Sequence, residues 1–195
     1  MLIYVTNRKL CKDDFLKRIG LLADSKPHAI ILREKDMGLL EFESLAKKVK
    51  SICETKRVDL IINRNIETAL KLGIPNIHLS MEYLRIYRNE TAGFIRTGVS
   101  VHSIAEAREA QETGAGYLIA GHIFATGCKE GIPSKGLVFL EEICKAVTIP
   151  VFAIGGITSE KVKNVRAAGA KGVCIMSEAM RDENPERLSG KFGFQ

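Results

Sequence analysis

The sequence predicts an α/β fold in which eight strand–helix units close into a compact (β/α)8 TIM barrel, and three observations support this prediction. Short β-branched runs alternate with amphipathic stretches along the 195 residues. The strand-like runs are continuously apolar, which is typical of a parallel sheet that is covered on both faces. Gly73, Gly114 and Gly169 each end a helical pattern, where a left-handed residue is favoured.

The predicted strands are residues 2–6, 29–33, 59–63, 76–80, 95–101, 117–123, 150–156 and 172–176. Helices are predicted near 12–23 and 41–54, and then in the stretches IETALKLG, EYLRIYR, IAEAREAQETG, VFLEEICKAV and SEKVKNVRAAG, before a short polar tail. A doubly wound open sheet is the competing architecture. We favour the barrel because the open sheet usually has fewer strands and its G-x-G-x-x-G fingerprint is absent after the first strand.

Length and composition predict one domain spanning residues 1–195. The chain holds 29 basic and 23 acidic residues, for a net charge of +6, and 46% of it is apolar. A chain of this length buries a sizeable core. No apolar run approaches the roughly 18 residues of a membrane-spanning helix, and the opening MLIYVTNRKL reverses the order of a signal peptide. We therefore expect a cytoplasmic protein that does not bind a membrane.

Metal centres and nucleic acid are both disfavoured. The five cysteines lack C-x-x-C spacing and the four histidines form no zinc motif, so we expect reduced thiols and no built-in metal. Basic residues are spread through helical stretches such as AKKVKSICETKR, without a helix-turn-helix pattern or interleaved aromatic residues. The modest positive charge instead favours a small anionic substrate, and no nucleic-acid partner is expected.

Two strand ends predict a phosphate site, because phosphate commonly binds such barrels at the loops after strands seven and eight. Gly155 and Gly156 follow the seventh strand and let backbone N–H groups approach an anion, although a plain tight turn is the alternative interpretation. Met176 and Ser177 follow the eighth strand, at the start of a short helix whose amides would face the same point.

The other strand ends are unusually polar, and carry Arg33, Glu34, Lys35, Asn63, Arg64, His78, Ser80, Ser100, His102, Ser103 and His122. Each alone could be a salt-bridged rim residue, but a barrel would bring them to one pocket, where a cation can pair with an anion. His122 can exchange a proton near neutral pH, although a hydrogen-bonded structural histidine is at least as common. Cys128 beside Lys129 is a second candidate, which we interpret as pocket lining because no base is evident.

Six motifs jointly resemble the thiamine phosphate synthase superfamily: ILREK (31–35), IIN (61–63), GVSVHS (98–103), AGHIFATGCKEG (120–131), PVFAIGGI (150–157) and GVCIMS (172–177). The resemblance covers nearly the whole chain, in order. It implies a (β/α)8 barrel that holds a thiazole phosphate at the glycine pair and at the turn after the eighth strand.

Within the superfamily, the synthases join a pyrimidine diphosphate to thiazole phosphate. They use Mg²⁺ held by an aspartate after the strand-three asparagine and by another in an H-L-G-Q-x-D segment, and Arg64 and Tyr83 stand at these positions here. Mg²⁺ prefers carboxylate oxygens and a diphosphate leaving group needs its charge neutralised, so these losses argue against a synthase. The loop 121–129 is similar to that of the TenI branch, the thiazole tautomerases. We therefore expect an isomerase of thiamine biosynthesis that aromatises a thiazole carboxylate phosphate by proton transfer.

This resemblance implies a role for each matching residue. His122 is the catalytic proton shuttle, and phosphate is bound by the backbone of Gly155, Gly156, Met176 and Ser177. The substrate-binding positions are Arg33, Lys35, Asn63, Ser100, His102, Thr126, Cys128 and Lys129. A proton shift requires neither a redox cofactor nor a metal, so none is expected. Arg64 is, as a hypothesis, a cationic replacement for the lost metal.

Two alternatives stay open. One is a thiamine phosphate synthase that retains Mg²⁺-dependent transferase activity, and the other is a non-enzymatic regulator that binds a phosphate ligand. The tail 181–195 is barely long enough for a closing helix of two or three turns. That side of the barrel is expected to be thinly covered or sealed by a second subunit in a homodimer.

Overall fold

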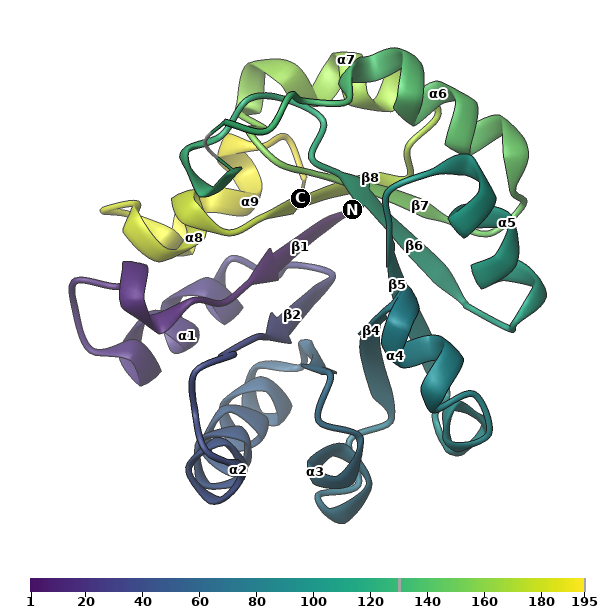
Figure 1. Ribbon diagram of the computed structural model, residues 1–195. Coiled ribbons are helices and arrows are strands. Elements are labelled where there is room, and N and C mark those ends of the chain that lie inside the picture. Colours follow the sequence, from purple (N-terminus) through teal and green to yellow (C-terminus); the bar gives the residue numbers. More distant parts are fainter. Residues whose placement is uncertain (130, 195) are drawn as a thin grey trace. The chain divides into compact units, whose positions relative to one another are not determined.

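The computed structural model describes residues 1–129 and 131–194. Glu130, which falls in the predicted loop after the sixth strand, and Gln195 lie outside the described residues. The strands form a closed barrel in which β1 to β8 are neighbours in sequence order. Figure 1 draws the strands as arrows and the helices as coiled ribbons. The predicted (β/α)8 barrel is therefore confirmed, and the open sheet is excluded.

The strands are β1 (Leu2–Val5), β2 (Ala29–Leu32), β3 (Asp59–Asn63), β4 (Asn76–Ser80), β5 (Arg96–Val101), β6 (Tyr117–Gly121), β7 (Val151–Ile154) and β8 (Gly172–Ile175). The α-helices are α1 (Phe15–Asp24), α2 (Leu39–Lys56), α3 (Ile66–Lys71), α4 (Met81–Ile86), α5 (Ile104–Glu112), α6 (Gly136–Ala146), α7 (Val162–Ala167), α8 (Ser177–Arg181) and α9 (Leu188–Lys191). Short 3-10 helices are η1 (Arg8–Leu10), η2 (Glu90–Gly93), η3 (Gly127–Lys129), η4 (Ser159–Lys161) and η5 (Pro185–Arg187).

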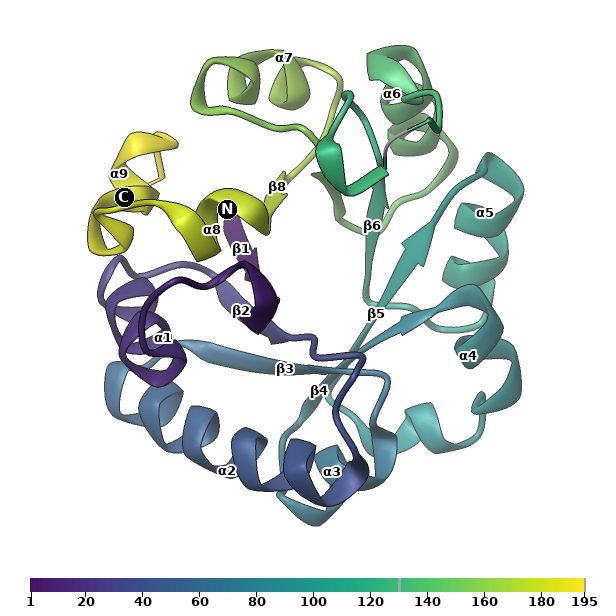
Figure 2. The ribbon, with the colours of Figure 1, turned by 60° about the vertical axis from the view of Figure 1, so that its left-hand side comes forward.

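The chain divides into two compact units. The first unit is Met1–Ile77 with Ile175–Gln195, and the second unit is His78–Cys174. In the first unit β1, β2 and β3 pair in parallel, with α1, α2 and α3 beside them (Figure 2). In the second unit β5, β6, β7 and β8 pair in parallel, with α5, α6 and α7 outside the strands (Figure 1). That residues 1–195 form one domain stays a prediction.

Several element boundaries differ from the sequence prediction by one or a few residues, and two of these differences have a clear local cause. Helix α1 begins at Phe15 rather than near residue 12, because the Asp14 side chain accepts a hydrogen bond from the Lys17 backbone N–H and caps the helix there. Strand β6 ends at Gly121 rather than Ile123. A Cβ at Gly121 would lie 2.5 Å from Cγ2 and 2.7 Å from the carbonyl oxygen of Ile154, so only glycine allows this approach to β7.

The C-terminal segment packs within the first unit. Leu188 and Phe192 are buried, and the buried Tyr4 hydroxyl lies 3.2 Å from Ser189 Oγ and 2.7 Å from Ser25 Oγ. The predicted closing helix is only the single turn of α9. The tail therefore packs on the first unit through buried apolar and hydroxyl groups, while the homodimer stays a prediction.

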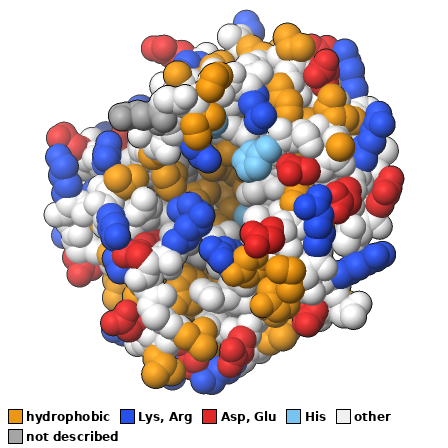
Figure 3. Space-filling view, in the orientation of Figure 1, with side chains coloured by type: hydrophobic (Ala, Val, Ile, Leu, Met, Phe, Trp, Pro, Cys, Tyr) orange, Lys and Arg blue, Asp and Glu red, His pale blue; other side chains and the backbone are white. Residues whose placement is uncertain are grey.

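Surface charge is mixed on the face seen in Figure 3, where Lys and Arg side chains are interspersed with Asp and Glu. In the described part of the chain, no helix combines the length and apolar character that crossing a membrane requires. All five cysteines are free thiols. Burial raises the pKa of Cys53 to about 12 and that of Cys144 to about 11, so both thiols stay protonated near neutral pH.

Candidate active site

Strands β5 and β6 of the second unit end in polar groups that contact one another. The register pairs Ser100 with Ile119 and Val101 with Ala120, so that His102 lies beside the end of β6. His102 Nδ1 is 2.8 Å from the carbonyl oxygen of Gly121 and donates a hydrogen bond to it, because a carbonyl can only accept. His102 as a whole is an exposed residue.

His122 is buried at 8% exposure, directly after β6. Its Nε2 lies 3.2 Å from the Ile132 carbonyl oxygen, so Nε2 carries a proton and donates it. The backbone of the same residue accepts from the Lys135 N–H at 3.0 Å. His122 therefore forms hydrogen bonds to the far end of the loop after β6 through both its side chain and its backbone.

The glycine pair after β7 packs directly on that loop. Gly155 and Gly156 have φ values of +99° and +62°, which L side chains rarely adopt. A Cβ on Gly155 would collide with His122, and one on Gly156 would collide with the Ala125 carbonyl and come within 2.9 Å of the Phe124 carbonyl. The pair is thus required for close packing of two loops, whereas its predicted anion binding stays a prediction.

Lys161 adds a cation beside the glycine pair that sequence reasoning missed. Its Nζ donates to the Gly156 carbonyl at 2.7 Å and lies 4.7 Å from the centre of the Phe124 ring. The carbonyl and the ring hold the ammonium group in place. The only signal in the sequence was a lysine five residues after the glycine, which has no general meaning.

The loop residues Thr126, Cys128 and Lys129 form or flank the short helix η3. The Cys128 backbone N–H donates to the Thr126 hydroxyl at 3.4 Å, and the Lys129 N–H donates to the Thr126 carbonyl at 3.0 Å. The side chains of Cys128 and Lys129 are exposed. Thr126 therefore shapes the turn, and roles for these three residues in substrate binding stay predictions.

The first unit brings Arg33 and Asn63 together. Leu32 pairs with Ile62 in the β2–β3 register, so the next residues along, Arg33 and Asn63, come to the same level of neighbouring strands. Both are partly exposed, while Lys35 is exposed. Arg64 follows Asn63 with a left-handed backbone, φ +68°. Two arginines thus lie at the ends of adjacent strands.

Glu34 lies between Arg33 and Lys35 in the chain but is a structural residue. It is 5% exposed, and its carboxylate accepts from the Thr6 hydroxyl at 2.6 Å and from the Arg8 backbone N–H at 2.9 Å. The Thr6 oxygen in turn accepts from the Arg33 N–H at 2.9 Å. Glu34 therefore joins the ends of β1 and β2 to η1.

Met176 and Ser177 also belong to the first unit, where Met176 precedes α8 and Ser177 is its first residue. Both are partly exposed. Their placement at the end of β8 agrees with the element order that the sequence predicted. Their part in phosphate binding stays a prediction, as does the convergence of all the polar strand ends on one pocket.

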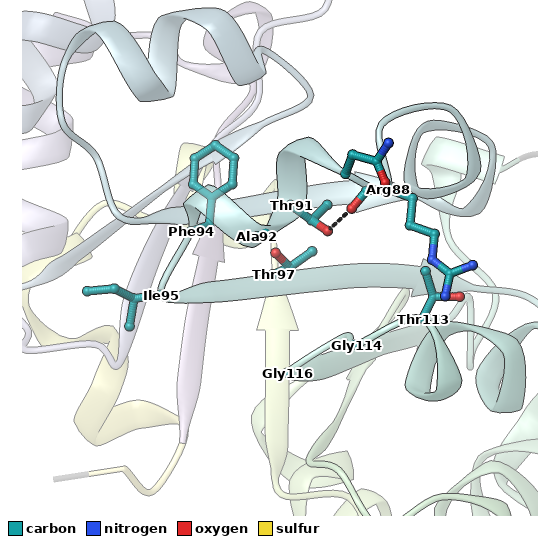
Figure 4. Close-up of a pocket in the computed structure, with 10 residues that line it drawn as sticks. Arg88, Thr91, Ala92, Phe94, Ile95, Thr97, Thr113, Gly114 and Gly116 are labelled. Atoms are coloured by element: carbon teal, nitrogen blue, oxygen red, sulfur yellow. Dashed lines mark hydrogen bonds between the residues drawn. The ribbon is translucent and has the colours of Figure 1, made fainter.

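The second unit also holds a hollow of about 490 Å³ at the opposite ends of its strands (Figure 4). It is lined by Arg88, Phe94, Thr97, Thr113 and Gly116 among others, and the Thr91 hydroxyl donates to the Arg88 carbonyl at its rim. Thr97 lies near the beginning of β5 and Gly116 precedes β6. Active sites of this fold lie where strands end, so this hollow is separate from the candidate site.

The residues present do not fit the Mg²⁺ site of the synthases that the sequence resembles. Mg²⁺ is held by carboxylates and phosphate oxygens, and the two positions carry the guanidinium of Arg64 and the phenol of Tyr83. Within residues 1–129 and 131–194, no group of three or more His, Cys, Asp or Glu side chains is arranged to hold a metal. A cation at one former ligand position repels a metal ion instead of binding it.

A (β/α)8 barrel with polar groups at its strand ends is the class that the fold and these residues define. The sequence profile described as "Thiamine monophosphate synthase" matches residues 2–179. The chain belongs to this thiamine monophosphate synthase family.

Individual relatives agree with the profile. The chain is 36% identical over 180 residues to a thiamine-phosphate synthase of Enterococcus faecalis, covering 91% of this chain and 85% of that protein. It is 32% identical over 194 residues to thiamine-phosphate synthase 2 of Streptococcus pneumoniae, covering 98% and 92%. The structure of a thiamine phosphate pyrophosphorylase from Pyrococcus furiosus superimposes with a TM-score of 0.84 at 25% identity, covering 98% of this chain and 93% of that one.

These comparisons support an enzyme of thiamine biosynthesis and correct the expected activity. The prediction of a thiazole tautomerase is wrong, because relatives at 32–37% identity over most of the chain are named thiamine-phosphate synthase. A catalytic role for His122 stays a prediction. The prediction gave two lost acidic residues and one loop more weight than similarity along the whole chain. The structure offers another use for that histidine, since His122 donates to a loop carbonyl.

Proposed function

We propose that this chain is a thiamine-phosphate synthase, a transferase that joins a pyrimidine diphosphate to a thiazole phosphate. The carbon–oxygen bond between the pyrimidine methylene group and the diphosphate breaks, a carbon–nitrogen bond to the thiazole ring forms, and pyrophosphate leaves. The observation that carries this proposal is the family match over residues 2–179, together with relatives of the same name that are covered over most of their length.

The leaving pyrophosphate needs its developing charge stabilised. Since the residues at the two former acidic positions do not suit Mg²⁺, we assign this stabilisation to the chain's own cations. Arg33 and Arg64 are the candidates, because they lie at the ends of the adjacent strands β2 and β3. A guanidinium can donate two parallel hydrogen bonds to phosphate oxygens, which suits a diphosphate. Asn63 and Lys35 are proposed to contribute further polar contacts.

Thiazole phosphate binding is assigned to the strand-seven loop. Gly155 and Gly156 have positive φ values and no Cβ, so their N–H groups can face an anion. Lys161, fixed on the Gly156 carbonyl, supplies positive charge next to them. The backbone of Met176 and Ser177 is proposed as a second phosphate contact, with Lys129 as a further cation. Ser100, His102, Thr126 and Cys128 keep their proposed role in substrate binding.

His122 is proposed to act on the loop rather than on the substrate. The new bond uses the lone pair of the thiazole nitrogen, so no proton has to pass through a histidine during the transfer. The buried imidazole instead holds the Ile132 carbonyl and thereby the shape of the loop that carries Thr126 and Lys129.

Turnover of both substrates tests this proposal. Purified protein is mixed with the pyrimidine diphosphate and the thiazole phosphate, with added Mg²⁺ or with a chelator, and thiamine phosphate and pyrophosphate are quantified. We expect both products in equal amounts. Binding of either substrate without product under both conditions would favour the non-enzymatic alternative and overturn the proposal.

A further inference from the structure

Three side chains of the second unit form a hydrogen-bonded chain that leads from the buried interior to a strand end. His78, on β4, is 4% exposed, and Tyr117, on β6, is 3% exposed. His78 Nδ1 lies 3.1 Å from the Tyr117 hydroxyl, and His78 Nε2 lies 2.8 Å from the Ser100 hydroxyl. Ser100 is partly exposed near the end of β5, so it is the member of the chain that a substrate can reach.

The arrangement is built into the strands. Gly98 pairs with Tyr117 in the β5–β6 register, and a Cβ on Gly98 would collide with the tyrosine ring. The ring therefore occupies the space that a side chain on Gly98 would fill. Phe152 packs edge-on against the same ring, with centroids 5.7 Å apart at 84°. Glycine and phenylalanine thus fix the direction of the Tyr117 hydroxyl toward His78.

The buried phenol decides which nitrogen of His78 carries the proton. Among the residues that the structure describes, His78 Nδ1 is the only hydrogen-bond partner of the Tyr117 hydroxyl. A phenol proton left without an acceptor in this interior would destabilise the fold, so the hydroxyl donates to Nδ1. Burial also raises the pKa of Tyr117, which keeps it a phenol. A neutral His78 then carries its proton on Nε2 and donates it to Ser100.

We propose that Tyr117 and His78 are positioning residues that hold the Ser100 hydroxyl as a hydrogen-bond donor toward substrate. With its oxygen accepting from His78, Ser100 directs its own proton outward, to an acceptor atom of a bound substrate. The opposite tautomer would turn Ser100 into a donor to histidine and leave its oxygen as an acceptor. The inference rests on the proposed function, because Ser100 is one of its substrate-binding positions.

The tautomer is measured first, on the whole chain without substrate. Protein labelled with ¹⁵N in histidine is studied by NMR that correlates the imidazole nitrogens with the ring protons, and His78 is assigned from a His78→Gln sample. We expect a protonated Nε2 and an unprotonated Nδ1. A protonated Nδ1 in the unmodified chain overturns the proposal. This measurement needs no turnover, so it tests the direction of the hydrogen bonds among Tyr117, His78 and Ser100 even if the proposed transferase activity fails.

A double-mutant cycle then tests whether Tyr117 acts through Ser100. Tyr117→Phe keeps the ring over Gly98 and removes only the hydroxyl, so the fold is retained and the His78 proton is no longer confined to Nε2. We expect about a tenfold loss of kcat/KM, the equivalent of one well-made hydrogen bond, and no further loss when Tyr117→Phe is added to Ser100→Ala. Losses that multiply in the double variant overturn the proposal.

Tyr87→Phe is the matched control. Tyr87 lies just after α4 in the same unit and is partly exposed, with its ring centroid 5.6 Å from that of Tyr83. Its hydroxyl can therefore be removed without changing the hydrogen bonds among Tyr117, His78 and Ser100. Its kcat/KM and the His78 tautomer should equal those of the unmodified chain. A Tyr87→Phe variant that loses as much activity as Tyr117→Phe would show a general effect of phenol removal and overturn the assignment.

Discussion

The end of β2 differs from the ends of β6 and β7 in the kind of residue that determines its structure. At β2 the Glu34 carboxylate is buried and fully engaged by the Thr6 hydroxyl and the Arg8 backbone. At β6 and β7 the defining residues are glycines, and their missing side chains let Gly155 and Gly156 pack on the loop after β6. A polar strand end can therefore serve the fold alone, while the residues that shape a site can be those with no side chain.

The largest effect that tests this contrast is expected at Gly156. A side chain there meets the Ala125 and Phe124 carbonyls in addition to an unfavourable φ of +62°. We expect Gly156→Ala to lower the free energy of unfolding by about 3 kcal/mol, from strain and overpacking together, and the proposed synthase activity to fall by roughly 100-fold or more. Urea titrations and initial rates measure the two effects.

Gly73→Ala separates strain from collision. Gly73 has nearly the same φ, +61°, but a Cβ at this position would meet no heavy atom within 4 Å beyond its chain neighbours. The variant should lose only about 1 kcal/mol of stability and keep its activity. Equal destabilisation of the two variants would mean that the loop contact at Gly156 contributes nothing.

Arg64 tests whether strand ends of the first unit take part in the reaction at all. Because a cation that stabilises a leaving group acts chiefly in the transition state, Arg64→Ala should lower kcat by about 100-fold with little change in KM. Arg64→Asp, which places a carboxylate at the former metal-binding position, should make the remaining activity rise with added Mg²⁺.

Arg57→Ala is the control for Arg64. Both arginines have left-handed backbones, with φ values of +55° and +68°, and they flank the same strand, one before β3 and one after it. Only the residue after the strand should matter for the reaction. A loss of kcat in Arg57→Ala as large as that in Arg64→Ala would sink the role assigned to Arg64.

Glu34 tests the structural half of the contrast. Removing its carboxylate leaves the Thr6 hydroxyl and the Arg8 N–H without their acceptor, so Glu34→Ala should lower the free energy of unfolding by about 2 kcal/mol. The kcat of the remaining folded protein should be unchanged. Asp36→Ala, which removes an exposed carboxylate next to Arg8, should leave Tm almost unaltered. A selective loss of kcat in Glu34→Ala would place Glu34 in the site.

The sequence predicted the elements well because their signals are local. The run DLIIN matches β3 residue for residue, and the alternation of apolar runs with amphipathic stretches predicted the barrel order. The end of β6 was placed two residues late, because the approach of Gly121 to Ile154 depends on a strand that lies about 30 residues further along. Such contacts leave no local pattern.

The site was predicted in outline but not in its working parts. The motifs correctly indicated the family. In the sequence, however, Glu34 cannot be distinguished from the polar residues beside it, and only the fold shows that its oxygens accept hydrogen bonds from the Thr6 hydroxyl and the Arg8 N–H. The pairing of Gly98 with Tyr117, and through it the contact with His78, depends on strand register. Register and burial, which the sequence pattern does not encode, separate a binding residue from a structural one.

The smallest expected effect concerns the ion pair of Arg18 and Asp13, which, like Glu34, stabilises the fold. The Arg18 guanidinium donates to both oxygens of the Asp13 carboxylate and also to the backbone carbonyls of Ala179 and Asp182, which ties α1 to the C-terminal segment. These hydrogen bonds from Arg18 lower the pKa of Asp13 from its usual 3.8 to about 2.

Because the pKa of Asp13 is lower in the folded chain than in the unfolded one, its stabilising effect is complete above pH 3.8 and is lost as the pH falls toward 2. The carboxylate is 40% exposed, so water screens the pair and the contribution is below about 1 kcal/mol. Asp13→Asn should therefore lower Tm slightly at pH 5 and converge with the unmodified chain at pH 2. Melting curves across this range check it, and a constant difference in Tm at every pH would contradict the assignment.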